Sequence, residues 1–168
     1  ELLRQMKAMP LAIIRGNASE IIVLANLWGL DTGVAKDGVR GVDATDSVDS
    51  AVVAARELAR FIHGAVAVSG EVDVVTDGDV VIQSYGGSPL FTRVTGSGCS
   101  LGGVCAVYAA VTDPLTAAIT AVNMYNAAGK IAERKSNGPG SFEKIFLDTM
   151  YNLSADDVAS NAMEIGRI

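Results

Sequence analysis

Short runs of consecutive apolar residues alternate along the chain with longer segments in which apolar residues recur every three or four positions. Runs that stop at a glycine or a polar turn are typical of buried strands, and the longer spacing is typical of amphipathic helices. This pattern predicts single strands at 11–14, 65–68 and 90–94. Segments 73–76 and 80–84 flank Asp77-Gly78-Asp79, so we expect them to form a hairpin.

Helix starts are marked by polar residues that can accept backbone N–H bonds. Asn17, followed three residues later by Glu20, is typical of a capping box, and Ser154 is predicted to cap a short last helix. The spacing predicts further helices over 47–61, 99–111, 114–134 and 141–151. The helix at 99–111 is almost wholly apolar and is expected to be buried, whereas the glycine-containing segment 29–46 is predicted to be a loop.

Alternation of buried strands and helices predicts one α/β domain over residues 1–168, with a mainly parallel sheet. The 168 residues fit a single domain, and 49% hydrophobic against 19% charged residues supply ample material for one core. Two cysteines and one histidine are too few for a disulfide framework or a paired Cys/His zinc site.

The charge and hydropathy of the chain exclude some classes of binding partner. With 13 Lys+Arg against 19 Asp+Glu, the net charge of -6 and the absence of a basic cluster argue against nucleic-acid binding. No apolar run reaches the roughly 18 residues of a membrane span, and no signal peptide opens the chain, so we expect a cytoplasmic protein. The chain starts at Glu1 without methionine and soon enters a strand, as a fragment of a longer protein would.

Segment 95–103 combines glycines with the start of a long apolar helix. Glycine lets the backbone approach phosphate oxygens, and the first N–H groups of a helix lack partners and carry partial positive charge. The candidate anion site is made of four residues: Gly96, Ser97, Gly98 and Cys99. The segment is neither a P-loop, which needs a lysine, nor a dinucleotide fingerprint, because Gly102 comes one residue late. From the residues alone, a phosphate site and a plain turn both remain open.

Cys99 is the candidate nucleophile or base of this segment. A thiol in the first turn of a helix can act as either, although most free cysteines are small buried hydrophobes. Cys105, farther along the apolar helix, is assigned to the core.

Two further segments place polar residues just past predicted strands. Arg15 to Glu20 supplies an arginine that can bind phosphate and a carboxylate that can hold Mg²⁺, although a capping box also explains Asn17 and Glu20. Ser69 to Asp73 follows the next strand in the same way. Ligands bind at the carboxyl ends of strands in open α/β sheets, so three segments are expected to meet at one rim.

Five motifs follow one another in a fixed order along the chain: Arg15 to Ile21, Gly41 to Asp43, Ser69 to Asp73, Val94 to Cys99, and Gly138 to Asp148. In this order they closely resemble hydroxyethylthiazole kinase, a ribokinase-like family of thiamine salvage. The resemblance covers essentially the whole chain and implies a layered α/β/α fold with a mainly parallel central sheet. It also implies that residues 1–168 correspond to the C-terminal two-thirds of such a kinase.

The resemblance implies phosphorylation of the hydroxyl of 4-methyl-5-(2-hydroxyethyl)thiazole by MgATP, in a homotrimer with sites between subunits. Arg15 and Ser69 match ATP contacts, Gly96 matches a substrate contact, and Glu20 matches the acidic residue near the metal. Gly96 to Cys99 would hold the transferring phosphoryl group. Cys99 would accept or orient the proton of the substrate hydroxyl, in a position where many relatives of the wider superfamily carry aspartate.

Four other functions are open. A hydroxymethylpyrimidine-type kinase and an ATP-dependent hydrate dehydratase share the scaffold, but they generally carry aspartate in place of Cys99. A non-catalytic nucleotide-binding fragment is compatible with the missing N-terminal third. A cysteine hydrolase would need His63 as the base, and His63 stands at a predicted helix end.

Overall fold

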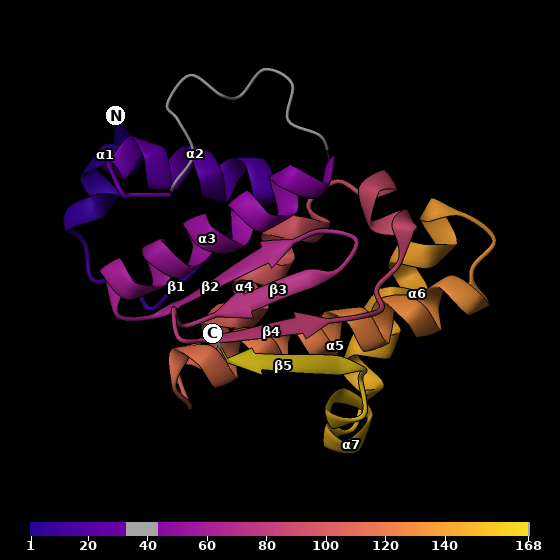
Figure 1. The fold of residues 1–168 in the computed structure, drawn as a ribbon. Helices are drawn as coiled ribbons and strands as arrows, with labels where there is room; N and C mark the ends of the chain where they lie inside the picture. Colours follow the sequence, from indigo (N-terminus) through magenta and orange to yellow (C-terminus); the bar gives the residue numbers. More distant parts are fainter. Residues whose placement is uncertain (33–43, 168) are drawn as a thin grey trace.

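The computed structural model describes residues 1–32 and 44–167, whose strands form one sheet in the order β1-β2-β3-β4-β5 (Figure 1). The strands are β1 (Ile13–Asn17), β2 (Ala65–Ser69), β3 (Asp73–Thr76), β4 (Val80–Ser84) and β5 (Met163–Arg167). The α-helices are α1 (Leu2–Gln5), α2 (Ala18–Trp28), α3 (Ala44–Ile62), α4 (Ser97–Ala109), α5 (Pro114–Lys135), α6 (Pro139–Asn152) and α7 (Ala155–Ala159). Two 3₁₀ helices complete the order: η1 (Met6–Ala8) and η2 (Pro89–Arg93).

The sheet is mostly antiparallel, so the expectation of a mainly parallel sheet is wrong. Only β1 and β2 are parallel, and the pairs β2–β3, β3–β4 and β4–β5 are antiparallel. A parallel neighbour needs a crossover of about a dozen residues or more. The helices between β1 and β2 provide one, whereas the three residues between β2 and β3 can only reverse the chain.

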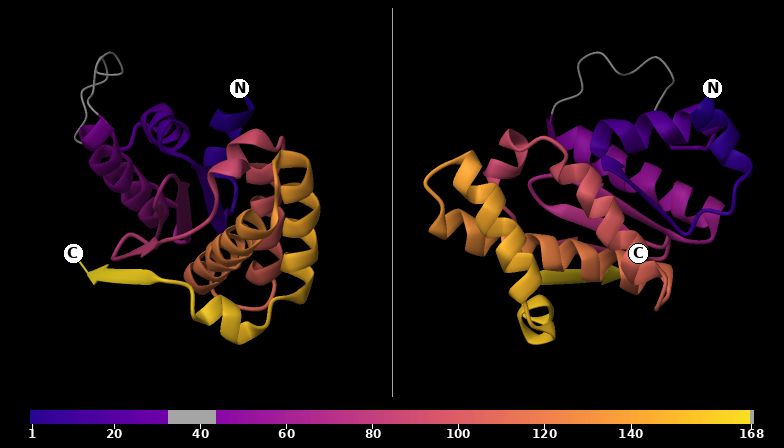
Figure 2. Two further views of the ribbon diagram at one scale, coloured as in Figure 1. Left: turned by 90° about the vertical axis from the view of Figure 1, so that its right-hand side faces the viewer. Right: turned by 180° about the vertical axis from the view of Figure 1, so that it is seen from behind.

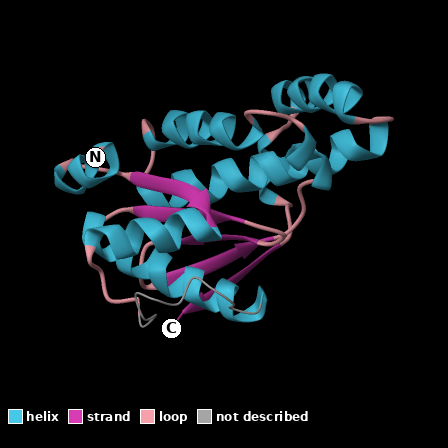
Figure 3. Cartoon of the chain, turned by 90° about the horizontal axis from the view of Figure 1, so that it is seen from above, coloured by secondary structure: helices cyan, strands magenta, loops and turns pink. Residues whose placement is uncertain are grey.

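Helices cover both faces of the sheet, which confirms the layered α/β/α arrangement (Figures 2 and 3). Along β2, Val66 and Val68 belong to the core under α2 and α3, while Ala65 and Ala67 belong to the core under α4, α5 and α6. Successive side chains of a strand point to opposite faces, so a strand covered on both faces is apolar at every position. This explains the continuous apolar run at 65–68.

Several predicted elements are confirmed. The hairpin occupies 73–76 and 80–84 as expected, and capping boxes start α2 at Asn17 and α7 at Ser154. The helix predicted over 114–134 is α5, with Pro114 in its first turn. Helix α3 begins at Ala44 and not at residue 47. Most of the loop predicted over 29–46, and the Gly41 to Asp43 motif, lie outside the described residues.

The strand predicted at 90–94 is wrong, because this segment forms η2. Pro89 occupies the first turn of η2, and the Ser88 side chain accepts the Leu90 N–H at 3.1 Å. The apolar residues that favoured a strand serve the core instead, since the Phe91 ring packs against Phe142 and Phe146. The place beside β4 is occupied by β5, a strand whose mixed sequence does not predict it.

Helix α4 is less buried than its apolar sequence suggests. Leu101 and Cys105 are buried, but Val107 is 70% exposed. The helix packs against α5 and β1 and contributes only one side to the core. The prediction that this helix is buried is therefore wrong for its outer face.

Candidate functional site

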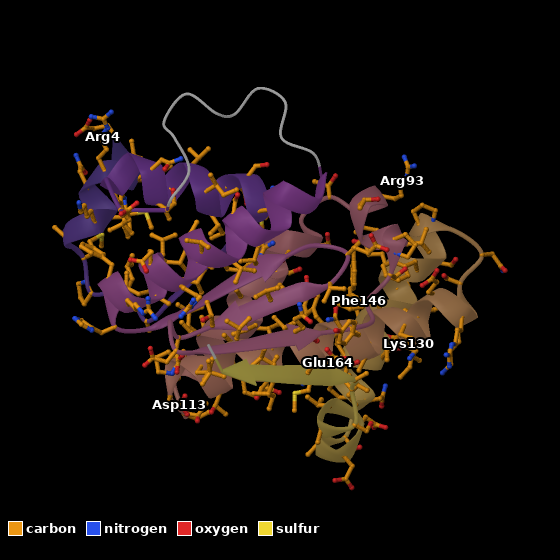
Figure 4. The ribbon with its side chains drawn as sticks, viewed as in Figure 1. Arg4, Arg93, Asp113, Lys130, Phe146 and Glu164 are labelled. Carbon is orange, nitrogen blue, oxygen red and sulfur yellow. The ribbon has the colours of Figure 1, made fainter. Side chains whose placement is uncertain are left out.

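The carboxyl ends of β1 and β2 lie side by side, because Asn17 pairs with Ser69 in the parallel register. The start of α4 reaches the same rim, at the end of the molecule marked by Arg93 in Figure 4. The Arg15 guanidinium joins the three segments: Nη1 donates to the Gly98 carbonyl at 2.7 Å, and Nη2 donates to Ser69 Oγ at 3.0 Å. The structure thus brings together the three segments expected at one rim, although the third follows a 3₁₀ helix and not a strand.

Arg15 is held closely by its surroundings. A Cβ atom at Gly98 would lie 3.0 Å from Arg15 Nη1, so only glycine lets the guanidinium rest on this turn without displacement. The Arg15 Nε is buried and has no hydrogen-bond partner among the described residues. A buried donor without a partner is costly, and this one lies beside the candidate anion site.

The first turn of α4 offers free backbone donors. Gly96 is the N-cap in a left-handed conformation (φ +87°), and it provides no capping side chain. Ser97 N–H donates to the Val94 carbonyl at 3.4 Å, and Ser100 N–H donates to the Gly96 carbonyl at 2.9 Å. The N–H groups of Gly98 and Cys99 have no partner among the described residues. Together with the helix dipole, these two donors can bind an anion.

The two cysteines of α4 differ in exposure, and only the burial of Cys105 was predicted from the sequence. Cys99 is exposed in the first turn, and Cys105 is buried at 3% exposure. Burial raises the pKa of the Cys105 thiol, and the charge of Arg15 only partly opposes this shift. Cys105 is therefore a core residue, and Cys99 is the thiol available for chemistry at the rim.

The cysteine hydrolase alternative conflicts with the geometry. His63 precedes β2, whereas Ser69, near Cys99, ends it. At about 3.3 Å per residue, the length of β2 is roughly 13 Å, so this strand separates the only histidine from the rim where Cys99 lies. No Cys–His pair forms.

Glu20 stands at the rim as part of the α2 capping box. Its Oε2 accepts the Asn17 N–H at 2.8 Å, and the side chain is exposed. The described residues contain no group of three or more His, Cys, Asp or Glu side chains that could hold a metal by themselves. Mg²⁺ is commonly held by one or two carboxylates together with phosphates and water, so a single exposed carboxylate beside an anion site fits this ion.

Asp73 is a rim residue to which sequence reasoning gives no separate role. Its Oδ1 accepts the Gly70 N–H at 2.9 Å, and its Oδ2 accepts an Nδ2–H of Asn126 at 3.0 Å. Burial raises the pKa of Asp73, opposed by these two hydrogen bonds and by the charge of Arg15. The carboxylate fixes the turn that follows Ser69. In the sequence, only its position four residues after Ser69 points weakly to this role. Asn126 stands among the alanines of α5, and no sequence signal marks it as a partner of Asp73.

Arg15 does not line either of two surface hollows. The larger, about 490 Å³, opens between α5, α6 and α7, and the smaller, about 240 Å³, lies between the end of η2 and the start of α6. The smaller one includes Thr95, the residue before Gly96. We assign the site to the Arg15 rim, because the converging donors lie there and not in the larger hollow.

Known proteins are similar to this chain in sequence and in architecture. A model of the hydroxyethylthiazole kinase family matches residues 1–156. The hydroxyethylthiazole kinase of Bifidobacterium longum (strain DJO10A) is 47% identical over an alignment of 178 residues, which covers 95% of this chain and 57% of that protein. The enzyme of the same name from Klebsiella pneumoniae (strain 342) is 47% identical over 148 residues, which cover 88% of this chain and 54% of that protein.

A solved structure agrees with these relatives. The hydroxyethylthiazole kinase protein from Pyrococcus horikoshii OT3 superimposes with a TM-score of 0.75 at 26% identity, covering 94% of this chain and 55% of that one. The chain thus spans little more than half the length of these relatives. None of the helices in the described ranges has the length and apolar character needed to cross a membrane. Because the family match extends over nearly all of its residues, the chain belongs to the hydroxyethylthiazole kinase family.

Proposed function

We propose that this chain carries the nucleotide and phosphoryl site of a kinase that transfers phosphate from ATP to the hydroxyl of 4-methyl-5-(2-hydroxyethyl)thiazole. The named relatives support the reaction, and membership in a kinase family implies ATP as a substrate. Because the chain spans about 57% of the length of one relative, the activity of the whole protein is part of the proposal.

One observation carries the proposal: Arg15 donates to both Ser69 and Gly98. These bonds place a fixed positive charge against the turn that presents free backbone donors. Phosphoryl transfer depends mainly on positioning and on stabilising negative charge, and this arrangement can supply both.

In the proposed site, Arg15 and Ser69 contact ATP, and Gly96 contacts the thiazole substrate. The backbone of Gly96 to Cys99 receives the transferring phosphoryl group through its N–H donors. Glu20 would hold Mg²⁺, which, when bound, neutralises charge on the phosphates.

Cys99 is the proposed acceptor of the proton from the substrate hydroxyl. It is exposed at the first turn, beside the free N–H donors. A thiolate is a less suitable base for an alcohol than a carboxylate is, so most of the rate enhancement is expected from positioning. The proposal includes a cytoplasmic homotrimer with sites between subunits.

The decisive assay measures ADP release from MgATP with and without hydroxyethylthiazole, together with the mass of the product. Thiazole-dependent ADP and a phosphorylated alcohol are expected.

Arg15→Ala should lower turnover at least about tenfold, since a hydrogen bond to a charged group contributes about 1.5–3 kcal/mol. Arg134→Ala, an exposed change in the last turn of α5, is the matched control.

Further variants separate the proposed roles. Glu20→Ala should lower turnover steeply, whereas Cys99→Asp should keep or raise it. A Cys99→Ala protein with undiminished turnover would remove the assignment of Cys99 as base. These comparisons need thermal unfolding curves for each variant, because Glu20 also caps α2.

The partial coverage of the relatives favours one second candidate, a non-catalytic nucleotide-binding part. In that case the chain binds ATP, as measured by calorimetry, but releases no ADP with the thiazole present. Loss of both ATP binding and turnover would contradict the kinase proposal and this alternative together.

A further inference from the structure

The phenol of Tyr125 lies directly behind the first turn of α4. Tyr125 belongs to α5 and is 5% exposed. Its hydroxyl donates to the Ser97 carbonyl at 3.1 Å and is hydrogen-bonded to Ser100 Oγ. One buried hydroxyl from α5 is thereby joined to two residues of the turn whose N–H groups form the candidate anion site.

Ser100, the hydrogen-bond partner of Tyr125, also contacts two backbone carbonyls of the same turn. Its Oγ lies 3.1 Å from the Gly96 carbonyl and 3.0 Å from the Ser97 carbonyl, and each can accept its proton. Each of the two hydroxyls has a single proton to donate. If Ser100 donates to a carbonyl, Tyr125 donates to Ser97 or Ser100; if Ser100 donates to Tyr125, the phenol proton is left for Ser97. In every arrangement Tyr125 is a donor to the turn.

The Tyr125 ring is itself fixed by its neighbours. Phe91 stacks on it with a centroid distance of 5.6 Å, and Phe146 meets it at 4.9 Å and 67°. Phe146 is labelled in Figure 4, among the side chains between the sheet and α6. Burial also raises the pKa of Tyr125, with the Ser100 hydrogen bond only partly opposing it. The hydroxyl therefore remains protonated at neutral pH and is held in one place.

The start of α4 lacks the usual means of fixing a helix end. Its N-cap, Gly96, has a left-handed conformation and no side chain to accept a hydrogen bond. An ordinary Ser, Asp or Asn cap would occupy the N–H groups that an anion needs. A hydroxyl acting on the Ser97 carbonyl and on Ser100 Oγ can hold the turn while these N–H groups stay free.

We propose that Tyr125 is a positioning residue, whose hydroxyl holds the first turn of α4 so that the Gly98 and Cys99 N–H groups face the transferring phosphoryl group. The inference rests on the proposed function for its catalytic consequence. Its structural part, the fixing of residues 97–100 from α5, stands apart from any turnover.

The test compares Tyr125→Phe with Tyr108→Phe. The first change removes the hydroxyl and keeps the ring against Phe91 and Phe146. The second removes a hydroxyl on α4 itself, which donates to Met124 Sδ at 3.4 Å and lies outside the site. Steady-state kinetics with MgATP and hydroxyethylthiazole give kcat and KM. Hydrogen exchange of the backbone amides at 97–100, of which Ser97 and Ser100 donate within the protein, gives the order of the turn.

For Tyr125→Phe we expect kcat to fall about five- to tenfold, since the lost hydrogen bond supports donors whose contribution grows in the transition state. The KM for ATP should stay within about twofold, while exchange at 97–100 becomes faster. Tyr108→Phe should change none of these. The double variant Tyr125→Phe/Ser100→Ala should lose no more kcat than the larger single effect, because both residues act on one turn.

Unchanged exchange at 97–100 in Tyr125→Phe would overturn the inference, and so would an equal fall of kcat in Tyr108→Phe. A wild-type chain without thiazole-dependent ADP release would overturn its catalytic consequence together with the proposed kinase activity. In that case, faster exchange in Tyr125→Phe alone would still establish the fixing of the turn by α5.

Discussion

Arg15 lies on the same side of β1 as Ile13, which packs into the core shared with α4 and α5. Alternation along the strand therefore turns the guanidinium toward α4, where it meets the Gly98 carbonyl. The neighbouring glycine and the strand register, and not Arg15 alone, make this contact possible. The geometry of the site therefore depends on Gly98 as much as on Arg15.

The aromatic cluster of Phe91, Tyr125 and Phe146 behind the site also depends on a small residue, Gly129. A Cβ atom there would lie 2.7 Å from two ring carbons of Phe91. We expect Gly129→Ala to lower the free energy of unfolding by about 1–2 kcal/mol, because overpacking outweighs the better helix propensity of alanine. Urea denaturation measures the change. Gly103→Ala, on an exposed face of α4 with no atom near the added Cβ, should instead gain up to about 1 kcal/mol.

A Gly129→Ala protein as stable as the wild type would mean that Phe91 can move away at little cost. The ring would then also be a poor support for Tyr125, and hydrogen exchange at 97–100 should show it.

The helices of this fold differ in how their N-terminal ends are capped. Helix α5 (Pro114–Lys135) is capped by Asp113, whose side chain accepts the Thr116 N–H at 3.0 Å. The start of α4 differs, because Gly96 leaves its donors free. A side chain thus caps the start of α5, whereas the start of α4 at the candidate site has no side-chain cap.

The Asp113 cap makes stability depend on pH. Hydrogen bonding to Thr116 lowers the pKa of Asp113 below its usual 3.8. A carboxyl whose pKa is lower in the folded state stabilises above its unfolded pKa and loses this effect as the pH falls through its folded pKa. Asp113→Ala should therefore lower Tm most near pH 7, and the difference from wild type should shrink below about pH 4.

Asp113→Asn serves as the control in this series, since it keeps a hydrogen-bond acceptor and removes the charge. Thermal unfolding followed by circular dichroism from pH 3 to pH 7 covers the range. A Tm difference between wild type and Asp113→Ala that is the same at both ends would show that the charge of the cap contributes nothing.

Across the whole molecule, buried amides tie the hairpin to the C-terminal segment. Ser84 Oγ accepts an Nδ2–H of Asn126 at 3.0 Å and lies 2.7 Å from Asn123 Oδ1. Asn161, after α7, donates to the Tyr85 carbonyl at 3.0 Å. These groups are satisfied only when the hairpin, α5 and the segment leading to β5 come together, so they favour a single arrangement of the three.

Asn126→Ala should lower the free energy of unfolding by about 1–3 kcal/mol, because Asp73 and Ser84 lose a buried donor. Asn152→Ala is the matched control, since this exposed side chain on α6 donates only to the Asp148 carbonyl. Urea denaturation of both variants provides the comparison. Equal stability of the two variants would show that water or a moved side chain replaces the lost amide.

Most helices and the hairpin follow from the sequence, because their signals are local. Caps such as Asn17 and Ser154, the prolines, and the periodic spacing act within one or two turns of chain. The segment 90–94 misleads because its β-propensity competes with Pro89 and with tertiary contacts of Phe91, and propensity is the weaker of the two. Strand β5 depends on pairing with β4, to which no local pattern corresponds.

The sequence by itself determined the α/β class, the helix starts, and the candidate residues Arg15, Ser69 and Gly96–Cys99, since each is marked by residues adjacent in the chain. Tertiary structure decided the antiparallel sheet, the meeting of Arg15 with Ser69 and Gly98, and the place of Tyr125 behind the turn. The contacts of Arg15 and Tyr125 join residues 28 to 83 positions apart. Their formation depends on strand register and helix packing, which arise only when distant segments bury their apolar faces together.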